Sequence, residues 1–230
     1  MISLIIVKVK NLVKRFLGLD HRVVCYAQEG EDIILSRLFR EKSVGFYVDI
    51  GAHHPKRFSN TYLLYCRGWR GINIDAMPGS MKLFQQIRPR DINLEMGVSN
   101  ETGVREYHVF QEGAVNTFDT KLAQINLNQG WKAQGRIPIV TRTINSILSE
   151  YLPPNTQIDL LSIDIEGLDS LVLSSLNFSL YRPGIIICED LDRNVEEVLS
   201  SDMASVLLKE GYYLSSKLLN SCVWKMKTPS

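Results

Sequence analysis

The chain has 230 residues, of which 45% are hydrophobic and 22% charged, with a formal net charge of +1. This length and balance suit one globular α/β domain with a full core. A charge so close to zero provides no concentrated basic surface, so no nucleic-acid partner is expected. The four cysteines show neither disulfide nor metal-binding spacing, and we therefore expect a reducing, cytoplasmic location.

Residues 1–24 form a separate basic and apolar segment, with Lys8, Lys10, Lys14 and Arg15 among aliphatic residues. The segment is too short and too charged to cross a bilayer. Its charges lie within and after the apolar part, unlike those of a signal peptide. We expect an amphipathic helix packed on the domain or on a second subunit, and peripheral membrane contact or disorder are the alternatives.

The remaining residues, 25–230, are predicted to form a single domain. Residues 28–39 predict a helix with acids in its first turn, and residues 46–50 a buried parallel strand that turns at Gly51. A helix that includes residues 60–65 follows, and residues 71–75 predict a second buried strand.

The turn after the first strand indicates the kind of ligand. Glycine there lets a nucleoside approach the backbone, and an acid at the end of the next strand accepts hydrogen bonds from ribose hydroxyls. No further glycine follows Gly51 before Gly68, so the G-x-G-x-x-G loop that binds a pyrophosphate is missing. An adenosine ligand without phosphate, such as S-adenosylmethionine, fits better.

Beyond Asp75 the chain keeps alternating strands and helices, as parallel strands joined by crossover helices do. Residues 111–140, rich in Gly, Asn and Gln, are predicted to be an acceptor-binding insertion with contacts from Asn116 and Thr117. The order predicts an α/β, Rossmann-like class I methyltransferase fold: a seven-stranded, mostly parallel sheet with a C-terminal antiparallel hairpin. The predicted elements are helices 80–87, 143–150, 168–176 and 195–208, strands 92–98, 104–110, 158–164 and 184–190, and the hairpin 212–216 and 222–226.

Several of these strands end in carboxylates, which parallel pairing gathers at one edge of the sheet. We expect Asp75 to hold the ribose hydroxyls of S-adenosylmethionine. Asp49, with the backbone of Gly51 and Ala52, is expected to face the methionine part of the same molecule. The alternative for each acid is to cap the following helix.

Asp164 and Glu166 are expected on the same side of an extended strand end. Two neighbouring carboxylates raise each other's pKa unless a cation lies near them. The cofactor sulfonium is one such cation. With Glu189 from the next strand, an all-oxygen site for Mg²⁺ or Mn²⁺ is the second possibility. Capping and turn roles without a metal are the alternative.

Two histidines, His53 and His54, follow the glycine turn and are candidate bases for a hydroxyl proton. Adjacent side chains point in different directions, so at most one faces an acceptor. We take His54, together with Asp164 and Glu166, as the candidate catalytic residues. The alternative for both histidines is a polar role at the start of a helix.

With these features, the chain resembles the FkbM family of S-adenosylmethionine-dependent methyltransferases. Members of the family are similar to sugar and macrolide O-methyltransferases of surface-polysaccharide or secondary-metabolite synthesis. The matching segments are residues 26–32 (YAQEGED), 46–55 (FYVDIGAHHP), 57–62 (RFSNTY), 68–78 (GWRGINIDAMP) and 161–167 (LSIDIEG).

The resemblance implies that the first loop and Asp75 bind the cofactor, that the 28–32 region approaches it, and that Asp164 and Glu166 line the floor of the site. Many relatives carry Asn where this chain carries His53. The full set of expected cofactor-binding residues is Gln28, Glu29, Asp32, Asp49, Gly51, Ala52, His53, Asn60, Thr61, Asp75, Ala76, Met77 and Gly97.

These features lead to one main hypothesis, an S-adenosylmethionine-dependent O-methyltransferase that acts on a sugar hydroxyl of a nucleotide-sugar or surface-polysaccharide precursor. The expected partner is that small-molecule acceptor, and a homo-oligomer is compatible with the sequence. A non-catalytic S-adenosylmethionine-binding module in a biosynthetic complex is the first alternative. A nicotinamide-dependent oxidoreductase is the second, and the missing glycines argue against it.

Overall fold

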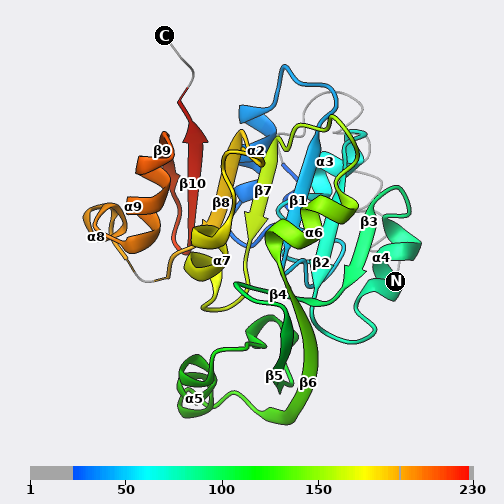
Figure 1. Cartoon of the computed structure of the whole chain (residues 1–230), viewed down its shortest axis with the longest axis vertical. Coiled ribbons are helices and arrows are strands. Elements are labelled where there is room, and N and C mark those ends of the chain that lie inside the picture. Colours follow the sequence, from blue (N-terminus) through cyan, green and yellow to red (C-terminus); the bar gives the residue numbers. More distant parts are fainter. Residues whose placement is uncertain (1–22, 192, 228–230) are drawn as a thin grey trace, which may run out of the picture.

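A seven-stranded sheet forms the centre of the protein (Figure 1). The structure is a computed structural model that describes residues 23–191 and 193–227, so the predicted N-terminal segment lies almost wholly outside the described residues. The strand order is β3-β2-β1-β7-β8-β10-β9, in which β10 runs antiparallel to both of its neighbours and the first five strands are parallel. This order confirms the predicted Rossmann-like class I methyltransferase fold.

The elements of this main layer agree with most of the predicted ranges. Its strands are β1 (Phe46–Ile50), β2 (Arg70–Asp75), β3 (Ile92–Glu95), β7 (Leu160–Ile163), β8 (Ile185–Glu189), β9 (Tyr212–Lys217) and β10 (Ser221–Met226). Its helices are α2 (Glu31–Leu38), α3 (Tyr62–Cys66), α4 (Met81–Ile87), α6 (Ile144–Tyr151), α7 (Asp169–Ser175), α8 (Val195–Leu199) and α9 (Asp202–Lys209).

The main sheet is buried on both faces because its strands are largely apolar. In β8, Ile186 and Cys188 pack on one face together with α6, α7 and α9, whereas Ile185 and Ile187 pack on the other face with α2 and α3. Successive strand residues point to opposite faces, which accounts for this alternation. Burial of each such aliphatic side chain contributes roughly 1.5–3 kcal/mol, so the strand ends are held on a rigid support.

A second, three-stranded sheet corrects one of the predicted strands. The strand expected at 92–98 is divided at Met96: β3 stays in the main sheet, and β4 (Gly97–Ser99) pairs with β6 (Ala133–Thr143). The Met96 amide still donates to the Asp75 carbonyl, so the chain leaves the main sheet after this residue. β5 (Gly103–Phe110) pairs antiparallel with β6 and completes the small sheet.

The region 111–140, which the sequence predicts as an insertion, contains regular secondary structure. It contains the short 3₁₀ helix η1 (Gly113–Val115), the helix α5 (Thr120–Asn128) and the first part of β6. Figure 1 shows β5, β6 and α5 extending together from the lower edge of the main sheet. This unit places α5 below the ends of β7 and β8.

The segment predicted as one helix at 195–208 forms two helices, α8 and α9, and Ser201 is the N-cap of the second. The Ser201 hydroxyl accepts a hydrogen bond from the Ala204 amide, as an N-cap does. A capping box of Asn194 and Glu197 begins α8 in the same way. Within the described ranges, no helix has the length and apolar character needed to cross a bilayer.

Candidate functional site

A cleft opens at the carboxyl ends of β1, β2 and β7, where the sequence predicts the cofactor. Two apolar walls close it, one from the β3–β4 segment and one from the small sheet. Ten of the predicted site residues line it: Gln28, Gly51, His53, Asp75, Ala76, Met77, Gly97, Asn116, Asp164 and Glu166.

Asp75 ends β2 and lies on the cleft wall, 8% exposed. Its Oδ2 accepts a hydrogen bond of 2.9 Å from the His53 amide, and its Oδ1 accepts one of 2.9 Å from the Met77 amide. Burial raises the pKa of this carboxyl, and these two amides counteract the rise. Each carboxylate oxygen has two acceptor positions, so each can still accept a ligand hydroxyl.

Gly51 makes the turn that opens the cleft beside β1. Its φ is +79°, and a Cβ placed on it would lie 1.7 Å from the backbone oxygen of Asp164. The Asp164 amide in turn donates to the Ile50 carbonyl. Only glycine permits so close an approach, and the result is that the ends of β1 and β7 lie against each other.

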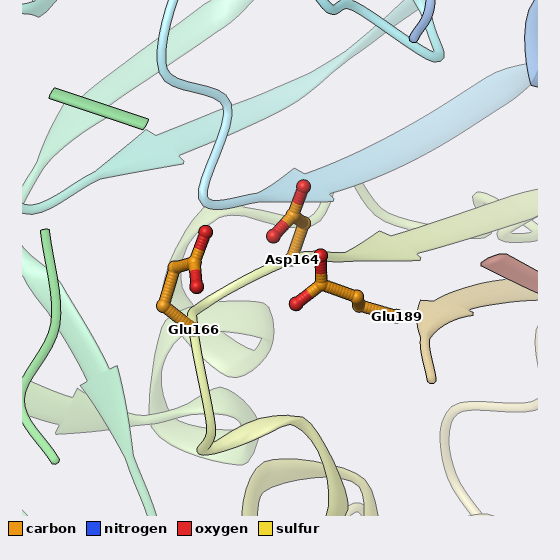
Figure 2. Close-up of side chains that lie close together, drawn as sticks. All are labelled: Asp164, Glu166 and Glu189. Atoms are coloured by element: carbon orange, nitrogen blue, oxygen red, sulfur yellow. The ribbon is translucent and has the colours of Figure 1, made fainter. Parts of the chain in front are cut away.

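Three carboxylates gather between the ends of β7 and β8, as Figure 2 shows for Asp164, Glu166 and Glu189. One oxygen from each lies within 4.8 Å of the others. These are the three residues that the sequence predicts as metal ligands. All three are half-buried, and no side-chain hydrogen bond or ion pair to them is found within residues 23–191 and 193–227.

Burial and mutual repulsion shift the pKa of each group upward. Burial, with added repulsion from Asp49, raises the pKa of Asp164 to about 7. Burial and the nearby Asp164 raise the pKa of Glu166 to about 8. For Glu189, burial and the other two carboxylates raise the pKa to about 10. Such a cluster favours protons, a divalent cation or another positive group.

The turn that presents Glu166 is held in an unusual backbone conformation. Glu166 has φ +50° and Gly167 φ +96°. The Thr117 hydroxyl, from the predicted insertion, donates a 2.7 Å hydrogen bond to the Glu166 carbonyl. Strained non-glycine residues concentrate at functional sites. Thr117 itself is buried, so it supports the site from behind rather than contacting an acceptor.

The two histidines have different surroundings. His53 lines the cleft with φ +49°, and burial lowers its pKa. His54, the predicted base, lies outside the cleft. Its Nδ1 accepts hydrogen bonds from the amides of Lys56 and Arg57, at 3.0 and 2.9 Å. The ring therefore stabilises its own loop, and of the three predicted catalytic residues Asp164 and Glu166 line the cleft.

Asp49 and Thr61, both expected to contact the cofactor, lie beneath the cleft in a buried polar network. The Thr61 hydroxyl donates to Asp49 Oδ2 at 2.6 Å and accepts from Arg88 Nη2 at 3.0 Å. Arg88 also pairs with Asp91 at 2.9 Å, and both side chains are fully buried. The apolar strand pattern does not reveal this network, because it depends on a buried arginine after α4.

The remaining expected residues also lie apart from the cleft. Glu29 accepts from the Asn220 amide, and Asp32 accepts from the Tyr26 amide at 2.8 Å. Asn60 donates to the Ser162 hydroxyl at 3.3 Å and borders a small recess next to Asp164. Ala52 is buried against α4.

Sequence reasoning missed the wall that the small sheet supplies. Tyr107 and Phe118 line the cleft on this side, and Asn116 does so as well, with its Oδ1 accepting from the Phe110 amide at 2.7 Å. Met96 lines it from the β3–β4 segment. Burial raises the pKa of Tyr107. In this region the sequence predicted site contacts only from Asn116 and Thr117. The strand pairing that brings β5 over the cleft leaves no pattern in the local sequence from which it could be predicted.

Comparisons with known proteins agree with this arrangement. The family model described as the methyltransferase FkbM domain matches residues 49–214, which is most of the chain. Among curated proteins, none matches the chain significantly.

Two solved structures are similar over most of their length. One is a TehB-like SAM-dependent methyltransferase from Corynebacterium glutamicum, 12% identical, with a TM-score of 0.43 and coverage of 95% of this chain and 97% of that chain. The other is a precorrin-6y C5,15-methyltransferase from Geobacter metallireducens, 9% identical, with a TM-score of 0.45 and coverage of 86% and 87%. The family match over residues 49–214 carries the assignment: this chain belongs to the FkbM methyltransferase family and is a methyltransferase.

Proposed function

We propose that the protein transfers a methyl group from S-adenosylmethionine to a hydroxyl of a sugar, in a nucleotide-sugar or surface-polysaccharide precursor. One observation carries the proposal: a cleft with an acid at the ribose position, Asp75, leads directly to a cluster of carboxylates beside the β7 end. Membership in the FkbM family supports S-adenosylmethionine as the methyl donor.

The residues of the cleft fit this cofactor. Asp75 has free acceptor positions for two ribose hydroxyls, and Met77, Met96 and Phe118 supply apolar surface for a base. Asp164 lines the same cleft and would act as a counter-ion for the positively charged sulfur. When bound, S-adenosylmethionine supplies an electrophilic methyl group on that sulfur.

The carboxylate cluster also fits a divalent cation. Asp164, Glu166 and Glu189 would hold it, because hard oxygen ligands suit Mg²⁺ and Mn²⁺ and these side chains lack a cationic partner among the described residues. The ion would lower the pKa of a hydroxyl that approaches it. Its charge would also hold all three carboxyls in their ionised form.

The protein's own contribution is alignment and proton removal. The rigid ends of β1, β2 and β7 hold cofactor and acceptor in line, and such positioning contributes about 7–11 kcal/mol in well-oriented reactions. When the cluster is ionised, the Glu166 carboxylate, which lines the cleft, can accept the hydroxyl proton. The strained turn at Glu166 and Gly167 fixes the direction of that carboxylate.

The test uses the full chain, S-adenosylmethionine with a labelled methyl group, and a panel of free sugars, nucleotide sugars and polysaccharide fragments. Each acceptor is tried with Mg²⁺, with Mn²⁺ and with EDTA. We expect label in a sugar methyl ether, with less of it in EDTA. Label in a nitrogen- or carbon-linked product instead, with no sugar ether formed, would contradict the proposal.

A further inference from the structure

A second depression, the acidic groove, lies on the far side of the carboxylate cluster from the cofactor cleft. Its walls come from α5, the start of α7, the end of β8 and the α8–α9 segment. Two cationic residues, Lys121 and Arg193, accompany a larger number of acids. The acids that line the groove are Asp119, Asp169, Glu189, Asp190, Glu197 and Asp202.

Two of these acids are buried without sufficient partners. The side chain of Asp190 is 2% exposed, and neither of its oxygens has a hydrogen-bond partner in the described part of the chain. Arg193 Nε lies 3.5 Å from Asp190 Oδ1, an ion pair that lacks hydrogen-bond geometry. Asp169 is 6% exposed, and its Oδ1 is also without a partner there. A buried carboxylate is costly unless a cation or a donor approaches it.

The groove also offers the contacts that a sugar ring needs. The Ser170 hydroxyl can bond to a ring hydroxyl, and Leu122 and Met203 supply apolar surface for a ring face. The Ser200 and Ser201 hydroxyls donate to backbone carbonyls, so toward a ligand they can only accept. Glu189 belongs both to this groove and to the carboxylate cluster. A molecule bound in the groove therefore lies next to the carboxylate cluster, on the side opposite the cofactor cleft.

We propose that the acidic groove binds the acceptor, and that this acceptor is an amino sugar whose protonated amine pairs with Asp190 and Asp169. The proposal rests on the methyl transfer proposed above and narrows its substrate class. Phosphate groups meet like charges in this groove, so the diphosphate of a nucleotide-linked acceptor must lie outside it. The amine supplies the positive charge that the buried carboxylates require.

The test measures binding rather than turnover, with D-glucosamine and N-acetyl-D-glucosamine as probes. The two sugars differ at the amine, which acetylation makes neutral. Isothermal titration into full-length protein saturated with S-adenosylhomocysteine should give a dissociation constant about tenfold lower for glucosamine. The isosteric variant Asp190→Asn should remove most of this preference. Equal affinity for the two sugars, or no binding of glucosamine, would overturn the proposal.

Two further variants make the test specific. Asp202→Asn, at the rim of the groove, should reduce the preference roughly two- to threefold, and it decides the question if Asp190→Asn does not fold. Glu196→Gln removes a charge from α8 outside the groove and should leave the preference unchanged. An unchanged preference in folded Asp190→Asn would contradict the assignment. Binding of S-adenosylhomocysteine in the same samples reports separately on the proposed methyl-transfer function.

Discussion

Replacement of Glu166 by Gln should stabilise the metal-free protein at alkaline pH. Burial among carboxylates raises the pKa of Glu166 from an ordinary value of 4.5 to about 8. Between these pH values the unfolded chain ionises Glu166 while the folded protein keeps it protonated. The stability that this proton provides is complete below the unfolded pKa and is lost as the pH rises through about 8.

The size of the effect follows from the difference between the two pKa values of Glu166, 4.5 in the unfolded chain and about 8 in the folded protein. Each pH unit corresponds to about 1.4 kcal/mol, so this difference implies an upper limit on the order of 5 kcal/mol. Water in the cleft screens part of this, and we expect Glu166→Gln to gain about 2 kcal/mol at pH 8.5 and much less at pH 5. For a chain of this length the gain corresponds to roughly 4–8 °C in Tm.

The assay is thermal unfolding in EDTA at both pH values. Glu101→Gln, which removes an exposed acid from the turn before β5, is the matched control and should change the free energy of unfolding by less than about 0.5 kcal/mol. A gain of equal size at both pH values, or a loss at pH 8.5, would refute the reasoning. Mn²⁺ should add more stability to the wild type than to Glu166→Gln, because it neutralises the same repulsion.

Three further predictions concern the carboxylate cluster and the support of the cleft. Asp164→Asn should weaken Mn²⁺ binding at least about tenfold, as measured by electron paramagnetic resonance of the free ion; full retention of Mn²⁺ would exclude this cluster. Gly51→Ala should cost several kcal/mol, on the order of 2–4, since its Cβ would lie 1.7 Å from a backbone oxygen, whereas Gly103→Ala, with open space around it, should be nearly neutral in denaturant titration. Arg88→Met should destabilise the fold by about 3–5 kcal/mol because the Asp91 carboxylate stays buried without its cationic partner; a change below 1 kcal/mol would show that water enters the network.

The main sheet could be predicted from the sequence because its strands carry their own pattern. β1, β2, β7 and β8 are apolar runs that end in acids, and parallel pairing leaves those acids at one edge. For the same reason the prediction named all three members of the carboxylate cluster. This kind of prediction works only for residues at strand ends, because the sheet topology alone decides where those residues lie.

The small sheet and the buried network could not be predicted in this way. The pairing of β4 with β6 joins segments about 40 residues apart, and it moves Met96 and Gly97 out of the expected strand. Side-chain partners are also invisible in a pattern of residue types. Glu29, Asp32 and Asp49 are acids near the right edge, yet none of them lines the cleft, and each accepts a hydrogen bond from elsewhere in the protein.

The most direct test of the account is isothermal titration of S-adenosylhomocysteine into the wild type and into Asp75→Ala. Asp75 is proposed to hold two ribose hydroxyls, and the loss of two hydrogen bonds to a charged group should weaken binding roughly 100-fold or more. The wild type should bind one equivalent, and Glu101→Gln should bind equally well. Undiminished binding by a folded Asp75→Ala variant would contradict the claim that the β2 carboxylate holds the cofactor.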